Sequence, residues 1–226
     1  MQAVPVITID GPSGSGKGTV SRGVAKALGW SLLDSGALYR LVALGARRAS
    51  IGLDDGPALA RLAGQIDIRF GSNASGEEVI YLDGQDATRA IRTEEAGNDA
   101  SKVAALPAVR SALLERQRRF AVPPGLVADG RDMGTVVFPD ARVKIFLTAS
   151  PSERALRRHK QLKEKGVAAN LAALSLDIAE RDQRDMARAV SPLVPSADAT
   201  TLDTTGMSVD DVIGRVLEIA RERLKN

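Results

Sequence analysis

The chain has 226 residues, of which 44% are hydrophobic, with a net charge of only +3, and this length allows one or two domains. Cysteine is absent, which excludes disulfide frameworks and thiolate metal sites and favours a reducing compartment, so we expect a cytoplasmic protein. The sequence shows neither a secretory leader pattern nor an apolar run of 18 residues, so no membrane association is expected.

The basic residues are mostly arginine, and the single histidine, His159, argues against histidine-based catalytic triads. Arginine forks match pairs of phosphate oxygens, so this bias suits a protein that handles phosphate groups. No long basic run is interleaved with aromatic residues, so we do not expect nucleic-acid binding.

A phosphate-binding loop follows the first predicted strand, the β-branched stretch 6–10. The loop has the spacing G-x-x-x-x-G-K, and a helical pattern with apolar residues on one face begins directly after it. Its glycines allow backbone N–H groups to turn toward an anion, and the helix N-terminus adds a positive end. The predicted nucleotide-binding residues are Gly11, Pro12, Ser13, Gly14, Ser15, Gly16, Lys17, Gly18 and Thr19.

One position departs from the usual form of this loop. The Ser or Thr that normally follows the lysine is replaced by Gly18, and a hydroxyl comes one residue later, at Thr19. The sequence therefore assigns no direct Mg²⁺ ligand with certainty. Thr19 and Asp129 are the candidates, either directly or through water.

Strands, loops and helices alternate along the first fifty residues. A short strand is predicted over 30–34 and a helix over 37–49, which is typical of a parallel α/β sheet. Ligands bind outside the carboxyl ends of the strands in such sheets, and Asp34, Ser35 and Arg40 fall at that edge. Ser35 also suits a helix cap, a role compatible with binding phosphate.

The region 51–107 has a different character. The segments 66–70 and 79–82 flank a Gly/Ser/Asn turn at 71–76, which predicts a small antiparallel hairpin. We interpret it as an inserted subdomain. A helix over 108–120 follows.

Polar residues again arrive where the next strands end. A buried strand at 126–128 runs into Asp129-Gly130-Arg131-Asp132, where Asp129 suits Mg²⁺ or its waters and Arg131 suits phosphate. Another core strand is predicted over 142–148, a last strand over 199–203 and a closing amphipathic helix over 209–224.

Two helices rich in charge lie between those strands. Residues 150–153 form a predicted helix start, and the cations from Arg154 to Lys165 indicate either a lid over a triphosphate or an ordinary basic helix. A helix over 171–188 places Arg181 and Asp185 four residues apart on one face, which suits a site or an internal salt bridge.

The chain closely resembles the bacterial-type cytidylate kinases along nearly its whole length. The resemblance rests on DGPSGSGKGT at 10–19, LLDSGALYR at 32–40, VADGRDMGTVVFPDA at 127–141, VKIFL at 143–147 and ERDQRDMARAVSPL at 180–193. It implies transfer of the γ-phosphoryl of ATP, with Mg²⁺, to CMP or dCMP in pyrimidine nucleotide metabolism.

The resemblance also implies roles for individual residues. Ser35, Arg40, Arg92 and Arg131 would hold the acceptor phosphate; Ser101, Arg110 and Asp132 would read the cytosine; and Arg181 and Asp185 would hold the sugar. Lys17 and Arg131 would act in catalysis, with Arg157, Arg158 and Arg188 near the moving phosphoryl group.

The implied fold is a P-loop kinase core with a central parallel sheet flanked by helices, plus an inserted monophosphate-binding subdomain with a small antiparallel sheet. The core is expected over 1–36 and 107–226, with a short helical lid at about 154–168, and the insert over 37–106. We expect a monomer. The alternatives are an NTP-dependent binding switch, which Gly18 argues against, and a kinase for another small acceptor.

Overall fold

The computed structural model of the chain describes residues 4–72, 75, 78–164, 166 and 168–225. They form two compact units, the first made of the chain up to Asp34 and from Arg118 onward, the second made of Ser35–Gln117. The α/β fold predicted from the sequence is confirmed.

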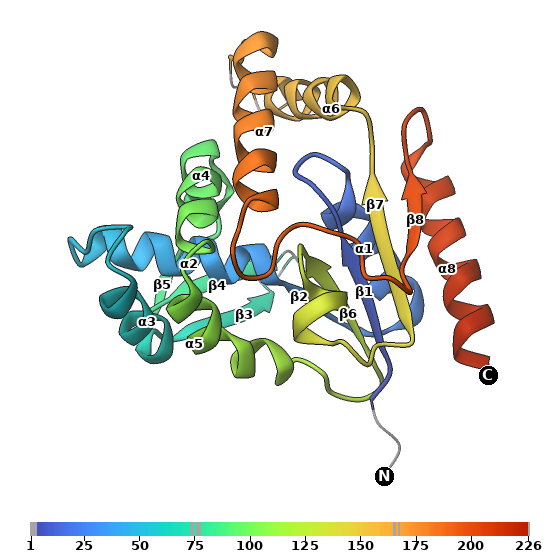
Figure 1. Cartoon of the computed structure of the whole chain (residues 1–226), viewed down its shortest axis with the longest axis horizontal. Helices are drawn as coiled ribbons and strands as arrows, with labels where there is room; N and C mark the ends of the chain where they lie inside the picture. Colours follow the sequence, from blue (N-terminus) through green and yellow to red (C-terminus); the bar gives the residue numbers. More distant parts are fainter. Residues whose placement is uncertain (1–3, 73–74, 76–77, 165, 167, 226) are drawn as a thin grey trace. The chain divides into compact units, whose positions relative to one another are not determined.

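The first unit contains a five-stranded parallel sheet in the order β2-β6-β1-β7-β8 (Figure 1). Ile7 and Ile9 of the middle strand are completely buried, as expected for a β-branched strand covered on both faces. Because the strands run parallel, their carboxyl ends, where the polar residues follow, lie at the same edge of the sheet. The strands are β1 (Val6–Asp10), β2 (Ser31–Asp34), β6 (Leu126–Gly130), β7 (Val143–Thr148) and β8 (Thr200–Asp203).

The helices of this unit are α1 (Lys17–Leu28), α6 (Pro151–Glu164), α7 (Leu171–Met186) and α8 (Val209–Lys225), with a π-helical turn η2 (Met133–Val137). Helix α1 buries Val20, Val24 and Ala25, as its periodicity predicts. It packs tightly on α8, since a Cβ at Gly23 would lie 2.3 Å from Cδ1 of Ile213. The predicted start of α6 is confirmed, because the Ser150 hydroxyl accepts the backbone N–H of Glu153 at 3.2 Å.

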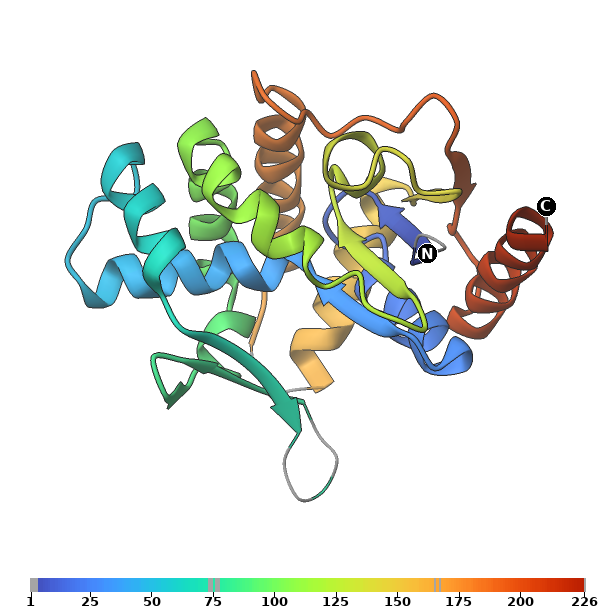
Figure 2. The same cartoon turned by 90° about the horizontal axis from the view of Figure 1, so that it is seen from below.

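The second unit consists of helices and a three-stranded antiparallel sheet, β3-β4-β5. The predicted hairpin is confirmed, and a short third strand joins it. In Figure 2 these strands, teal to green, lie on one side of α2, in light blue. Of the predicted turn at 71–76, residues 73, 74 and 76 lie outside the described residues. The elements are α2 (Ser35–Arg48), α3 (Gly56–Gln65), β3 (Ile68–Ser72), β4 (Glu78–Leu82), β5 (Gln85–Asp86), the 3₁₀ turn η1 (Ala90–Arg92), α4 (Glu94–Val103) and α5 (Pro107–Arg118).

An ion pair joins two helices of the second unit. Nε of Arg47 on α2 lies 2.5 Å from Oδ2 of the buried Asp99 on α4. Helix α4 is among the elements that the sequence did not predict. The predicted functional division, with an insert over 37–106, stays a prediction. In the part of the chain that the structure describes, every helix is too short or too polar to cross a lipid bilayer.

Candidate active site

The phosphate-binding loop lies between β1 and α1, as its sequence predicts. Gly11 has φ +152°, and a Cβ there would be only 2.1 Å from the carbonyl oxygen of Leu147 on β7. Only glycine therefore lets the loop pass so close to the neighbouring strand. Gly16 is left-handed at the N-cap of α1, with φ 87°. The first N–H groups of α1 then form, with the helix dipole, a ready anion site.

Lys17 folds back along this loop. Its Nζ donates to the carbonyl oxygen of Pro12 at 3.1 Å. Burial, together with the neighbouring cations Arg131 and Arg181, lowers the pKa of Lys17 to about 7, although Asp129 opposes this shift. Residues predicted separately, on the loop, β6 and α7, are thus brought within electrostatic reach of one another. A bound polyphosphate would relieve the repulsion among these cations.

Asp185 joins two of the predicted arginines. Its Oδ2 accepts from Nε of Arg131 at 3.0 Å, and its Oδ1 pairs with the guanidinium of Arg188. Asp185 is 2% exposed and Arg188 9%. Burial disfavours the charge of Arg131, but Asp185 and other carboxylates raise the pKa of that guanidinium above its ordinary value. Arg131 is therefore held charged, and one buried carboxylate orients both Arg131 and Arg188.

Asp129 ends strand β6 next to the start of α1. Its Oδ2 would lie 3.2 Å from a Cβ at Gly18, so the glycine leaves room for this carboxylate beside the helix. Burial, with a smaller contribution from Asp34, raises the pKa of Asp129 to about 6, although the charge of Lys17 opposes the rise. Thr19, the other candidate metal ligand, is exposed on α1. Mg²⁺ commonly takes one or two carboxylates plus substrate phosphates, and Asp129 offers one such carboxylate.

Asp10, which sequence reasoning did not assign to the site, orients the segment after β6. Its carboxylate accepts the backbone N–H groups of Met133 and Gly134 at 2.9 and 2.8 Å. Burial raises the pKa of Asp10 to about 7, although these two hydrogen bonds oppose the rise. The segment held this way carries Arg131 and the buried Asp132. The signal available in the sequence was its place at the end of β1, directly before the loop.

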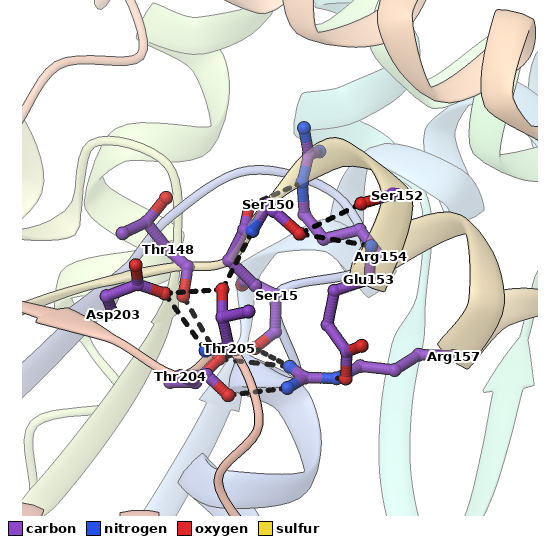
Figure 3. Close-up of polar contacts among 11 residues, drawn as sticks. Ser15, Thr148, Ser150, Ser152, Glu153, Arg154, Arg157, Asp203, Thr204 and Thr205 are labelled. Carbon is purple, nitrogen blue, oxygen red and sulfur yellow. Dashed lines mark hydrogen bonds and ion pairs between the residues drawn. The ribbon is translucent and has the colours of Figure 1, made fainter.

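Arg157, predicted near the transferred phosphoryl group, lies in a network beneath the loop (Figure 3). Its Nη1 donates to the carbonyl oxygen of Ser15 at 3.3 Å and to Oγ1 of Thr204 at 3.0 Å, and its Nη2 donates to the Thr204 carbonyl at 2.6 Å. Its Nε pairs with Glu153 at 2.8 Å. Arg157 therefore ties the loop to the segment after β8. Thr204, 1% exposed, was not predicted from the sequence.

Other residues considered in the sequence analysis lie further along α6 and after it. Arg158 is half-buried, and its Nη1 donates to Oε1 of Gln161 on the same helix at 3.1 Å. His159 is half-buried on the same helix. Lys165 and residue 167 of the predicted lid lie outside the described residues.

The other predicted substrate residues belong to the second unit. Nη1 of Arg40 donates to the Ile91 carbonyl at 2.7 Å, and Nη2 of Arg92 pairs with Glu78 at 2.9 Å. Ser35 and Ser101 are buried there.

Arg110, predicted to read the cytosine, is buried in the second unit, with 8% of its surface exposed. Its guanidinium lies 5.6 Å from the centre of the Tyr39 ring, and Nη1 donates to the Ala104 carbonyl at 3.1 Å. A buried, oriented guanidinium is suited to recognition of acceptor atoms.

Known proteins are similar in sequence to this chain. The sequence profile described as Cytidylate kinase matches residues 7–222. Proteins named cytidylate kinase from Colwellia psychrerythraea and Bordetella bronchiseptica are 55% and 58% identical to it, over 99% and 97% of this chain and 99% and 96% of their own lengths.

A solved structure shares its fold. The uncharacterized protein from Eubacterium ventriosum aligns with a TM-score of 0.50 at 12% identity, covering 97% of this chain and 99% of its own. This likeness concerns the fold alone. The sequence matches show that the chain belongs to the cytidylate kinase family.

Proposed function

We propose that this protein transfers the γ-phosphoryl group of ATP to CMP or dCMP, giving ADP and CDP or dCDP. The proposal is supported by family membership and by one observation: Lys17 of the phosphate-binding loop lies within electrostatic reach of Arg131 and Arg181. Positive charge from three separate elements suits two phosphate-bearing substrates better than one.

The reaction needs little acid–base chemistry from the protein. The acceptor phosphate has a second pKa of about 6, so its attacking oxygen is already ionised near neutral pH. That oxygen forms a bond to the γ-phosphorus while the bond from this phosphorus to the bridging oxygen of ADP breaks. The protein therefore has to align the reactants and stabilise charge on the transferred group.

Different residues of the first unit would align the reactants and stabilise the charge on the transferred group. The loop Gly11–Thr19 would bind the ATP phosphates, and Lys17 would leave the Pro12 carbonyl for the transferred oxygens. Arg131 and Arg188 would face the phosphate groups, while Arg181 and Asp185 would hold the sugar. The ion pairs of Asp185 with Arg131 and with Arg188 would fix the orientation of these two arginines.

Asp129 is the proposed residue for Mg²⁺, directly or through water, with Thr19 as the other candidate. When bound, Mg²⁺ would neutralise charge on the phosphates. In the second unit, Ser35, Arg40 and Arg92 are proposed for the acceptor phosphate, and Ser101 and Arg110, with Asp132 of the first unit, for the cytosine. These roles rest on the family resemblance. A monomer in the cytoplasm, where such nucleotides are found, is also proposed.

The test is a coupled assay with ATP, Mg²⁺ and a panel of CMP, dCMP, UMP, AMP and GMP. We expect ADP release together with the diphosphate of cytidine or deoxycytidine, at a rate well above that with the other monophosphates. ADP release without any nucleoside diphosphate would instead indicate an NTP-dependent switch. Efficient turnover of another acceptor, with CMP inert, would contradict the proposed substrate. Sedimentation of the same sample would test the monomer.

A further inference from the structure

Arg154 connects three elements of the first unit. It lies near the start of α6, where it is only 5% exposed. Its Nη1 donates to the carbonyl oxygen of Ser13 in the phosphate-binding loop at 2.9 Å, and its Nε donates to the carbonyl of Ala149 after β7 at 3.2 Å. The same Nη1 lies 2.5 Å from Oδ2 of Asp182 on α7. One side chain therefore bonds to the loop, to the strand end and to a second helix.

The backbone of α6 also lies directly against the loop. A Cβ at Gly14 would be 3.0 Å from Cβ of Arg154 and 3.2 Å from its carbonyl oxygen. Gly14 has φ +77°, a conformation that other residues rarely adopt. The tip of the loop and the first turn of α6 are thus packed together without space for a side chain. A displacement of α6 at this point has to move the loop.

Asp182 links Arg154 to the proposed acceptor residues. It is 8% exposed and lies on α7 between Arg181 and Asp185. A helix is rigid over such a short distance, so the position of Asp182 is tied to that of its two neighbours. Arg181 and Asp185 in turn act on the charge of Lys17. The contacts of Arg154 and Asp182 therefore form a continuous connection from Ser13 to the residues proposed for the acceptor sugar.

We propose that Arg154, through Asp182, is a positioning residue that couples nucleotide binding at the phosphate-binding loop to acceptor binding by α7. This inference rests on the proposed function. An acceptor bound to Arg181 and Asp185 fixes the position of α7. The Arg154–Asp182 pair transmits this position to the phosphate-binding loop at Ser13. Arginine suits this role because its planar guanidinium serves several acceptors in fixed directions. The coupling is reciprocal, so each nucleotide strengthens binding of the other.

The experiment measures the dissociation constant of CMP by calorimetry with and without a non-hydrolysable ATP analogue. For the wild type we expect the analogue to tighten CMP binding by roughly fivefold or more, the lower end of typical allosteric coupling. In the Arg154→Met/Asp182→Leu double variant this ratio should fall below about twofold. The double variant removes both charges, since loss of one partner alone would leave a buried charge and destabilise the fold.

Two further variants separate positioning from folding. Asp182→Asn removes the charge on α7 but keeps the side-chain size and an oxygen that still accepts from Arg154, so the guanidinium retains a partner, and we expect this variant to lower the ratio as well. Lys144→Met is the matched control. Lys144 is a buried cation of β7, 6% exposed, whose Nζ lies 2.8 Å from Asp198, and it has no assigned part in the site. This control should retain the wild-type ratio.

Several outcomes would overturn the inference: a wild-type ratio of one, an unchanged ratio in the double variant or in Asp182→Asn, or an equal loss in Lys144→Met. Failure of the proposed function looks different. In that case the wild type itself does not phosphorylate CMP in the panel assay, whatever the binding ratios.

Discussion

Asp10 and Gly134, which are 124 residues apart in sequence, meet at the start of the π-helical turn, where Oδ2 of Asp10 lies 2.8 Å from the backbone nitrogen of Gly134. A Cβ at Gly134 would lie 2.8 Å from Oγ1 of Thr8, so the turn is pressed against β1 as well as bonded to it. The carboxylate that precedes the phosphate-binding loop thereby also places Arg131 and Asp132. The end of β1 organises the nucleotide loop on one side and the segment after β6 on the other.

This relationship predicts a pH-dependent contribution of Asp10 to stability. Burial raises the pKa of folded Asp10 to about 7, from an ordinary value of 3.8 in the unfolded chain. Between these values the folded protein binds the proton more tightly, so the contribution is present at low pH and is lost as pH rises toward 7. Relative to Asp10→Asn, the wild type should lose on the order of 2 kcal/mol of unfolding free energy between pH 5 and pH 8.

Urea unfolding of both proteins at these two pH values measures the change. Asp198→Asn serves as the control, because hydrogen bonds from Lys144 and Ser196 lower the pKa of Asp198 to about 2, which removes its titration from this range. A wild-type and Asp10→Asn pair whose stability difference stays constant from pH 5 to pH 8 would show that Asp10 titrates in its ordinary range.

Lys17→Ala should collapse turnover while leaving the fold intact. The ammonium group is placed in the loop to stabilise the transferred oxygens, and removal of such a group commonly costs roughly 10²–10³ in kcat. Initial rates with ATP and CMP, together with the thermal midpoint, provide the measurement. Lys26→Ala, an exposed lysine on the same helix, is the control and should keep full activity. A Lys17→Ala enzyme that retains more than a tenth of wild-type turnover would refute the assignment.

Binding of ATP should be accompanied by uptake of a proton at pH 8. Without nucleotide, burial holds the pKa of Lys17 at about 7, so the amine is mostly neutral at that pH. A bound polyphosphate raises this pKa because it favours the charged form. Calorimetry in buffers of different ionisation enthalpy measures the uptake, which should approach one proton per site in the wild type. Lys17→Met should abolish most of it; equal uptake in both proteins would assign the proton to another group.

The base preference should depend on Asp132, which is 2% exposed. A carboxylate accepts from the exocyclic amine of cytosine, and Arg110, the arginine also proposed for base recognition, donates to the ring acceptors. Uracil reverses both patterns, and each mismatched buried contact costs about 1–3 kcal/mol. We therefore expect kcat/KM for CMP to exceed that for UMP by roughly 10²–10⁴.

Asp132→Ala should remove much of this discrimination, whereas Asp140→Ala, which removes an exposed carboxylate of the same segment, should preserve it. Wild-type use of UMP within fivefold of CMP would rule out the proposed base reading. A strong CMP preference that survives in Asp132→Ala would mean that another residue recognises the amine.

Hydrogen exchange should divide α6 into two parts. Its first turns are held by Arg154 and Arg157, so their amides should be protected even without nucleotide. The last turn, with Lys163 and Glu164 exposed, should gain protection only when an ATP analogue and CMP are both bound, as expected of a closing lid. Mass spectrometry of both states tests this. Unchanged exchange in the last turn would leave it an ordinary basic helix.

Much of the fold could be predicted because its signals are local. A few neighbouring residues are enough to indicate the conformation in each case. Examples are the β-branched strands, the apolar periodicity of the helices, and the serine and proline at the start of α6. Helix α4 was missed because its sequence, EEAGNDASKV, is mostly polar, and it becomes a helix by packing on α2 through Arg47 and Asp99. The π-helical turn Met133–Val137 was also missed, since its stability depends on the distant carboxylate of Asp10.

The sequence by itself determined the phosphate-binding loop, because a turn that requires glycine, followed by a helix N-terminus, is a short-range property. It also indicated the family, because five segments along the chain carry the resemblance. Only the tertiary structure decided what each charged side chain does. Arg154 and Arg158 lie one turn apart on one basic helix, yet the first is buried and bonds to the loop and to α7, whereas the second is half-buried and donates to Gln161 of its own helix. Asp185 pairs with Arg131 across 54 residues of sequence. Such pairings depend on which strand ends and helices meet at the sheet edge, and long-range packing sets that.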